Sequence, residues 1–186
     1  FVNKQLTNEN RSDIISGTYI FLENFLSELD FATKVDSAEV KGPEEIQKEL
    51  IPISKLKDYI FWRQKEFIEK YQGVRHNTEN DNYSILEAVT KNDNKLLAVV
   101  NTDLLSWEKK ASHPWISILT LKYNGDDIGM PNKEDYELLN TIEGKIMSQL
   151  QDADGYLNVG RQTVNGEREI YFACKDFRKP SKVLFD

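Results

Sequence analysis

The hydrophobic residues of the first part of the chain recur at helical spacing. Over residues 12–30, and again over 54–73, they fall three and four positions apart, as on one face of a helix. Pro43 is placed to open a short helix between these two segments. The pattern predicts an N-terminal helical region over residues 1–75, followed by a polar stretch with the composition of a linker.

In the second part of the chain the period changes to the alternation that is typical of strands. The apolar runs 83–90 and 95–104 flank the turn sequence KNDN and predict a hairpin. Residues 114–123 alternate as a third strand. An amphipathic helix over residues 132–151 follows, which Asn132 is placed to cap.

The clearest local signal is Asn165-Gly166 between two strand-like runs, because both residues tolerate the positive φ of a tight hairpin turn. Residues 114–186 thus read strand, helix, strand, strand and the start of a helix headed by Ser181, which is the order of a ferredoxin-like unit. We predict an α+β domain over residues 82–186, with helices on one face of an antiparallel sheet that the first hairpin extends. Because the final helix is so short, we expect the natural chain to continue beyond Asp186.

The composition is that of an ordinary globular protein, with 39% hydrophobic and 30% charged residues. The net charge of −7 comes without a basic tail or stripe, so we expect no direct binding of nucleic acid, which needs clustered Lys and Arg. No apolar run approaches the roughly 20 residues that cross a bilayer, and we expect no membrane partner. The single cysteine, Cys174, cannot form an internal disulfide, which favours a cytoplasmic protein.

Three segments of the second domain together resemble a known family. They are HPWISILTLKYNG, which begins at His113, LLNTIEGKI, which begins at Leu138, and NVGRQTVNGEREIYFACKD, which begins at Asn158. Spread over about residues 82–186, this pattern resembles the DUF695 domain family of bacterial proteins. Members of that family usually continue through a further helix and strand, which this chain lacks.

The resemblance implies no activity, because none is established for the family. Some members are fused to a domain like regulator of ribonuclease E activity B, another small acidic protein of ferredoxin-like character. By association, the resemblance therefore implies an adaptor or regulatory role that acts through protein contacts.

His113 is a candidate general base or metal ligand, but the chain offers it no obvious companions. The other histidine, His76, lies in the polar stretch, and no CxxC, HExxH or HxH spacing occurs, so we predict no metal and no cofactor. We expect His113 to end a loop and to donate a hydrogen bond to the backbone. We expect Cys174 to be buried on a strand face with Ile170 and Phe172 rather than to act as a nucleophile.

Arg161 is the strongest single candidate for a binding residue. Pairing of the strands across the last turn predicts an ion pair between Arg161 and Glu169 or Glu167. If Arg161 instead points into a cleft, it is best placed to bind a carboxylate or an acidic residue of a partner. Trp107, in the loop before the third strand, is the tryptophan that we expect to be exposed and available for a contact.

Two functions stay open. The leading hypothesis is a non-enzymatic module that binds a protein partner, since no catalytic constellation or cofactor motif occurs. The alternative is a small-molecule-binding or hydrolytic enzyme whose side chains converge on a pocket at the sheet face. RNA binding through the sheet is least favoured, because Tyr171 and Phe172 face opposite sides and the charge is acidic. The candidate binding residues are His113, Trp115, Arg161, Glu169 and Tyr171.

Overall fold

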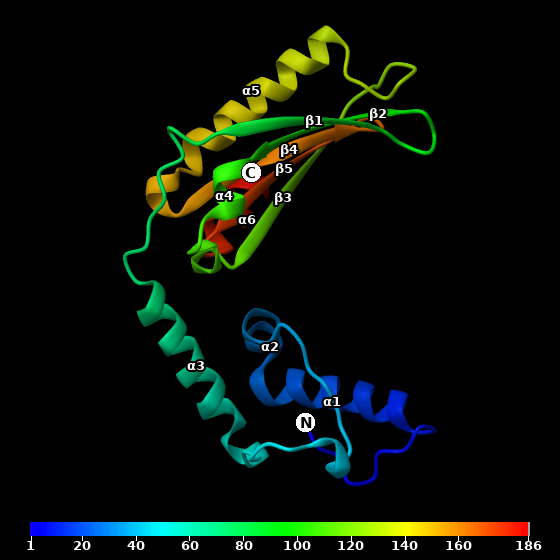
Figure 1. The fold of residues 1–186 in the computed structure, drawn as a ribbon, viewed down its shortest axis with the longest axis vertical. Coiled ribbons are helices and arrows are strands. Elements are labelled where there is room, and N and C mark those ends of the chain that lie inside the picture. Colours follow the sequence, from blue (N-terminus) through cyan, green and yellow to red (C-terminus); the bar gives the residue numbers. More distant parts are fainter. Residues whose placement is uncertain (186) are drawn as a thin grey trace. The chain divides into compact units, whose positions relative to one another are not determined.

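A computed structural model describes residues 1–185, and the chain folds into two compact units, Phe1–Gln72 and Gly73–Asp186 (Figure 1). The expected continuation beyond Asp186 lies outside the described residues. No helix of residues 1–185 has the length and apolar character needed to cross a membrane.

The N-terminal unit is helical, as the spacing predicts, but its first helix is broken. Ser27 adopts a φ of 85°, which ends the first helix, and its side chain then accepts a hydrogen bond from the Asp30 backbone N–H to cap the second. The predicted single helix over residues 12–30 is therefore two helices. Pro43 opens only a short 3-10 turn. The helices are α1 (Arg11–Leu26), α2 (Glu28–Lys34) and α3 (Leu56–Tyr71).

The second unit is built on a five-stranded antiparallel sheet with the order β1-β2-β4-β5-β3. Strand β5 lies between β3 and β4, with a helix joining β3 to β4, and this arrangement confirms the predicted ferredoxin-like unit. The β1–β2 hairpin pairs with the free edge of β4 and extends the sheet, as predicted. The strands are β1 (Tyr83–Val89), β2 (Lys95–Asn101), β3 (Trp115–Lys122), β4 (Tyr156–Val164) and β5 (Glu167–Cys174).

Three helices belong to this unit: α4 (Thr102–Ser106), α5 (Lys133–Gln149) and α6 (Arg178–Phe185). Asn132 caps α5 by accepting a hydrogen bond from the backbone N–H three residues on, as predicted. The cap predicted for α6 is wrong. Ser181 lies inside that helix, because Asp176 already accepts the N–H of Arg178 at its start.

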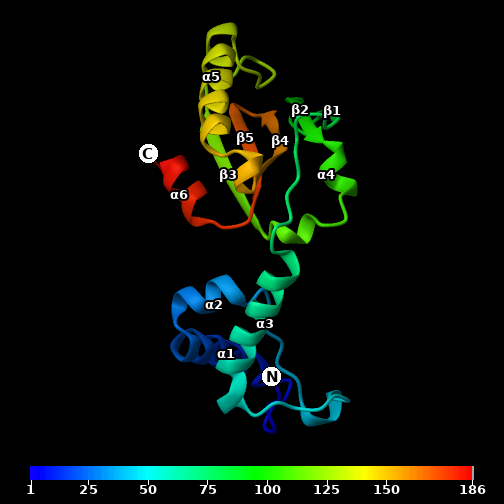
Figure 2. The same cartoon turned by 90° about the vertical axis from the view of Figure 1, so that its left-hand side faces the viewer.

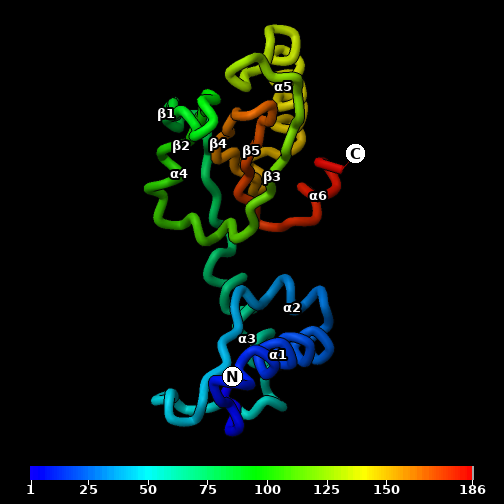
Figure 3. The backbone as a smooth tube through the Cα atoms, turned by 90° about the vertical axis from the view of Figure 1, so that its right-hand side faces the viewer, coloured from blue at the N-terminus to red at the C-terminus, as the bar shows by residue number. Residues whose placement is uncertain are grey.

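Helices α5 and α6 cover the same face of the sheet, which we call the helix face (Figures 2 and 3). Ile170 and Phe172 of β5 are fully buried there against Ile146 of α5, and Val183 of α6 packs against the same cluster. Cys174 lies on the same face of β5 as Ile170 and Phe172 and has no exposed surface. The prediction that it is buried is therefore confirmed. The core thus sits over β3, β5 and β4, and not over the β1–β2 hairpin.

The stretch 74–82, which the composition predicts as a linker, packs within the second unit instead. Thr78 donates hydrogen bonds to Asp152 from its backbone N–H at 2.8 Å and from its hydroxyl at 3.0 Å. The ammonium group of Lys175 donates to the carbonyl of Val74. Polar side chains hold this stretch in place, and such bonds leave no periodic pattern in a sequence.

Candidate functional site

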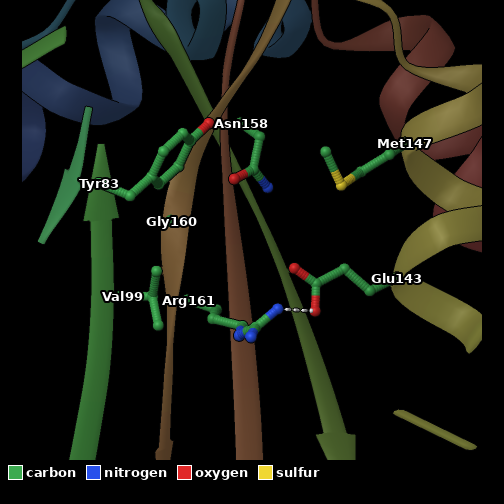
Figure 4. A pocket seen from close by; sticks show the side chains of 7 residues that line it. All are labelled: Tyr83, Val99, Glu143, Met147, Asn158, Gly160 and Arg161. Carbon is green, nitrogen blue, oxygen red and sulfur yellow. Dashed lines mark hydrogen bonds and ion pairs between the residues drawn. The ribbon is translucent and has the colours of Figure 1, made fainter. Parts of the chain in front are cut away.

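A groove lies on the helix face where α5 borders the β1–β2 hairpin (Figure 4). We call it the hairpin groove, and its cavity is about 260 Å³. A second hollow of about 360 Å³, towards the start of β4, shares Met147 and Asn158 with it. The hairpin groove is lined by Tyr83, Val99, Glu143, Met147, Asn158, Gly160 and Arg161.

Strand register explains why these side chains meet. Residues directly opposite each other in an antiparallel pair lie on the same face. Val99 of β2 is opposite Arg161 of β4, and Arg161 is opposite the core residue Ile170 of β5. Arg161 therefore projects from the helix face, towards Glu143 on α5.

A buried ion-pair cluster forms one side of the groove. Glu143 Oε2 accepts a hydrogen bond from Nη1 of Arg161 at 2.7 Å and lies 3.7 Å from Nη1 of Arg168. Arg168 is almost fully buried, and it donates to Oδ1 of Asn140 at 2.9 Å and to the hydroxyl of Thr163 at 3.2 Å. Two guanidinium groups thus share one carboxylate.

The cluster carries a net positive charge. Burial lowers the pKa of Arg168, as does the neighbouring charge of Arg161, while Glu143 raises it. A guanidinium nevertheless stays protonated in a protein, so both arginines remain cations beside the single anion Glu143. An anion that enters the groove would neutralise the excess positive charge.

Two further polar groups face the same space. Nδ2 of Asn158 is buried and has no hydrogen-bond partner among the described residues. The Tyr83 hydroxyl accepts a bond from Asn101 at 3.3 Å, which leaves its own proton free to donate, and burial is the largest of the causes that raise the pKa of Tyr83. Nδ2 of Asn158 and the Tyr83 hydroxyl are therefore both available as hydrogen-bond donors.

Gly160 forms the floor of the groove and can be no other residue without a shift of the backbone. Its φ is +144°, and a Cβ built there would lie 2.1 Å from the carbonyl oxygen of Val99. The β4–β5 register shifts at this point, between Asn158 and Gly160. This bulge turns Asn158 to the helix face and lets β2 approach β4 closely.

The ion pair predicted between Arg161 and Glu169 or Glu167 is wrong. Glu169 lies on the face opposite to Arg161, and Glu167 lies 3.5 Å from Lys122 on β3. A two-residue turn at Asn165-Gly166 fixes this register. Counting back from that turn in the sequence places Arg161 opposite Ile170, and not opposite Glu169.

Glu169 and Tyr171 belong to the other side of the sheet, which we call the open face. There the Glu169 carboxylate accepts hydrogen bonds from the Tyr171 hydroxyl and from Nε2 of Gln162, both at 2.5 Å. Burial and the Glu169 carboxylate raise the pKa of Tyr171 to about 12, so the hydroxyl keeps its proton. No basic side chain of residues 1–185 pairs with Glu169.

Exposed aliphatic side chains lie on the same face of the sheet as this polar centre. Ile118 is opposite Tyr171 in the sheet, and Ile116 and Leu86 lie on the same face. Ile116, Ile118 and Leu86 are 58%, 51% and 56% exposed, so the rest of the second unit leaves them largely uncovered. Exposed apolar residues are typical of protein-interaction surfaces, which combine an apolar core with polar groups.

His113 lies in a third place, at the end of the loop before β3. It is 4% exposed, its Nδ1 is 2.8 Å from the Ser112 hydroxyl, and its Nε2 has no hydrogen-bond partner within residues 1–185. The expected side-chain bond to the backbone is thus a bond to a hydroxyl. Burial, together with the charges of Lys175 and Arg75, lowers the pKa of His113 to about 4.

The tryptophans also differ in their surroundings. Trp107 is half-buried between His76 and His113, with ring centroids 4.9 and 5.5 Å away, so the expectation that it is exposed is wrong. Trp115 packs at the edge of the core and contacts Phe177 with a centroid distance of 4.8 Å. Both rings therefore contribute to packing.

The five candidate residues thus do not form one site. Arg161 lies in the hairpin groove, Glu169 and Tyr171 lie on the open face, and His113 and Trp115 pack at the start of β3. Within residues 1–185, no three His, Cys, Asp or Glu side chains gather in a way that could hold a metal ion.

Glu143 and Asn158 were not predicted as site residues. Glu143 had a signal, because it falls between Leu139 and Ile146 on the buried stripe of α5, where a carboxylate needs a partner. Asn158 had none, since its orientation depends on the bulge in β4.

The fold of the second unit is that of an α+β domain, with helices on one face of an antiparallel sheet. Residues 87–185 match a family described as a family of unknown function (DUF695), and the chain belongs to this family. The resemblance seen in the sequence is therefore confirmed. No curated protein and no solved structure matches the chain.

Proposed function

We propose that the second unit is a non-enzymatic binding module that recognises a partner protein through the open face. The observation that carries this proposal is the exposure of Ile116, Ile118 and Leu86 on the same face of the sheet as the Glu169 carboxylate. Burying apolar area of this kind is the dominant favourable contribution to most protein association.

The polar centre indicates what the partner presents. Glu169 accepts bonds from two neutral groups and has no cation beside it among the described residues. A partner surface that places a Lys or Arg over Glu169, surrounded by apolar side chains, would match both the charge and the exposed aliphatic residues. A regulatory or adaptor role would follow from such recognition.

The alternative, an enzyme that uses Arg161, Glu169 and His113 together, receives no support from their placement. Arg161 and Glu169 project from opposite faces of the sheet. His113 is buried in its loop with a pKa lowered to about 4, so it is neutral at physiological pH.

The test compares two variants in a pull-down of the full chain from its native cells, with mass spectrometry of the captured proteins. Ile118→Glu places a charge on the open face. Leu138→Glu is the matched control, because Leu138 is 56% exposed and lies on α5, in the layer on the other side of the sheet. We expect wild type and Leu138→Glu to capture the same partner and Ile118→Glu to lose it. Equal capture by both variants would refute the open face as the docking surface.

A further inference from the structure

The hairpin groove is a second candidate binding surface, separate from the open face. It lies on the helix face, and its walls combine Val99 and Met147 with Arg161 and Glu143, the two members of the positively charged cluster that line it. The groove is therefore apolar along its sides and cationic at one end.

We propose that the hairpin groove binds a small carboxylic acid that has an apolar body and a second hydrogen-bond acceptor. Its carboxylate pairs with Arg161, its body lies along Val99 and Met147, and its second acceptor receives the N–H of Asn158. This proposal does not depend on the function of the open face.

The carboxylate follows from the donors of Arg161. Its guanidinium has five N–H groups, and the described part of the chain uses only Nη1, towards Glu143. Arg161 is part-exposed in the groove, whereas Arg168 is engaged by Asn140 and Thr163. The free edge of a planar guanidinium fits a carboxylate in a bidentate pair.

The second acceptor follows from Asn158. A buried amide N–H without a partner is costly, because it has lost its bonds to water. Asn158 lines both the hairpin groove and the adjoining hollow, and Figure 4 shows its amide pointing into the space between Tyr83 and Met147. A carbonyl oxygen of a ligand that lies along the groove would accept this N–H.

The size of the site favours a small ligand. The two hollows, of about 260 and 360 Å³, meet at Met147 and Asn158. Sites for small molecules typically measure about 300–1,000 Å³. A phenyl ring with a short acid chain is of suitable size.

The probes are 3-benzoylpropionate, which has a carboxylate and a ketone, 4-phenylbutyrate, which lacks the ketone, and 4-phenylbutanol, which lacks the charge. Binding to the full chain is followed by the amide NMR shifts of Val99 and Gly160, which border the groove. We expect saturable shifts with both acids, about two- to tenfold tighter binding for the ketone, and at least tenfold weaker binding of the alcohol.

Three variants locate the contacts. Arg161→Gln should weaken both acids about tenfold or more, and Asn158→Leu should remove only the advantage of the ketone. Arg178→Gln is the control for a lost positive charge, because Arg178 is a mostly exposed arginine of the same unit, and it should leave affinity unchanged. If Arg161→Gln does not fold, the affinities of the two acids are measured with Arg161→Lys and Asn158→Leu instead.

The proposal is overturned if neither acid gives saturable shifts at Val99 and Gly160. It is also overturned if the alcohol binds as tightly as the acids, or if Arg178→Gln weakens binding as much as Arg161→Gln does. Because Ile118→Glu lies on the other face, it should not change the affinity for either acid, so the two proposals can fail separately.

Discussion

His113 should make the second unit unstable to mild acid. Its imidazole is 4% exposed and packs between Ser112 and Trp107, with the positive charges of Lys175 and Arg75 nearby. Protonation would bury a cation without an acidic partner. Burial therefore lowers its pKa from 6.5 to about 4 in the folded chain.

The sign and size of the effect follow from linkage. Between pH 6.5 and 4 the unfolded chain binds the proton more tightly than the folded chain, so stability falls as the pH falls. One pKa unit corresponds to about 1.4 kcal/mol, so the full contribution is about 3 kcal/mol. It is fully present above pH 6.5, and about 2 kcal/mol of it is lost by pH 5.

The assay is urea unfolding of the full chain at several pH values, followed by the amide signals of Ile170 and Phe172, which report on the core of the second unit. Carboxylates also titrate in this range, so wild type is compared with His113→Gln, which cannot take up the proton. We expect the pH dependence of the two proteins to differ by about 2 kcal/mol between pH 7 and 5.

His76→Gln is the control, because it removes the other histidine of the chain. It should retain the acid-dependent loss that His113→Gln lacks. If His113→Gln loses as much stability as wild type between pH 7 and 5, the buried neutral imidazole is not the cause, and the reasoning is refuted.

Further predictions concern the free energy of unfolding, measured by urea denaturation at pH 7. Gly160→Ala should destabilise by more than about 2 kcal/mol, because its Cβ would meet the Val99 carbonyl oxygen, whereas the control Gly144→Ala, with open space in α5, should stabilise by about 1 kcal/mol. Phe172→Ala should cost about 3–5 kcal/mol from the fully buried core, and a smaller loss would show that the core refills the cavity. Glu143→Gln should cost about 3 kcal/mol, since it leaves Arg168 buried without an anion; an unchanged stability would contradict the ion-pair cluster.

Much of the second unit could be predicted because its strands and helix carry strong periodic patterns. The turn at Asn165-Gly166 has φ values of 54° and 78°, as its sequence demands. Strand β3 alternates between its two faces as the residues of 114–123 do. These features depend on local sequence, which is why they are visible without a structure.

The site was less predictable, because it depends on contacts between distant segments. The sequence predicted Arg161 as a binding candidate. It did not predict its partner Glu143, which lies 18 positions away on α5. The bulge that turns Asn158 to the helix face lies where β2 approaches β4 closely, and no local pattern encodes it. Likewise, Ser27 breaks a helix that its neighbours favour, through a positive φ that serine rarely adopts.

The topology of the sheet also sets an order of assembly. Strands β4 and β5 are joined by two residues, and hairpins of this kind form within about 1–10 μs. Strand β3 pairs with β5 only after the whole of α5 and β4 has been placed between them, which requires closing a loop of many residues. We therefore expect the β4–β5 hairpin to form the folding nucleus, on which β3 and the β1–β2 hairpin add as the outer strands.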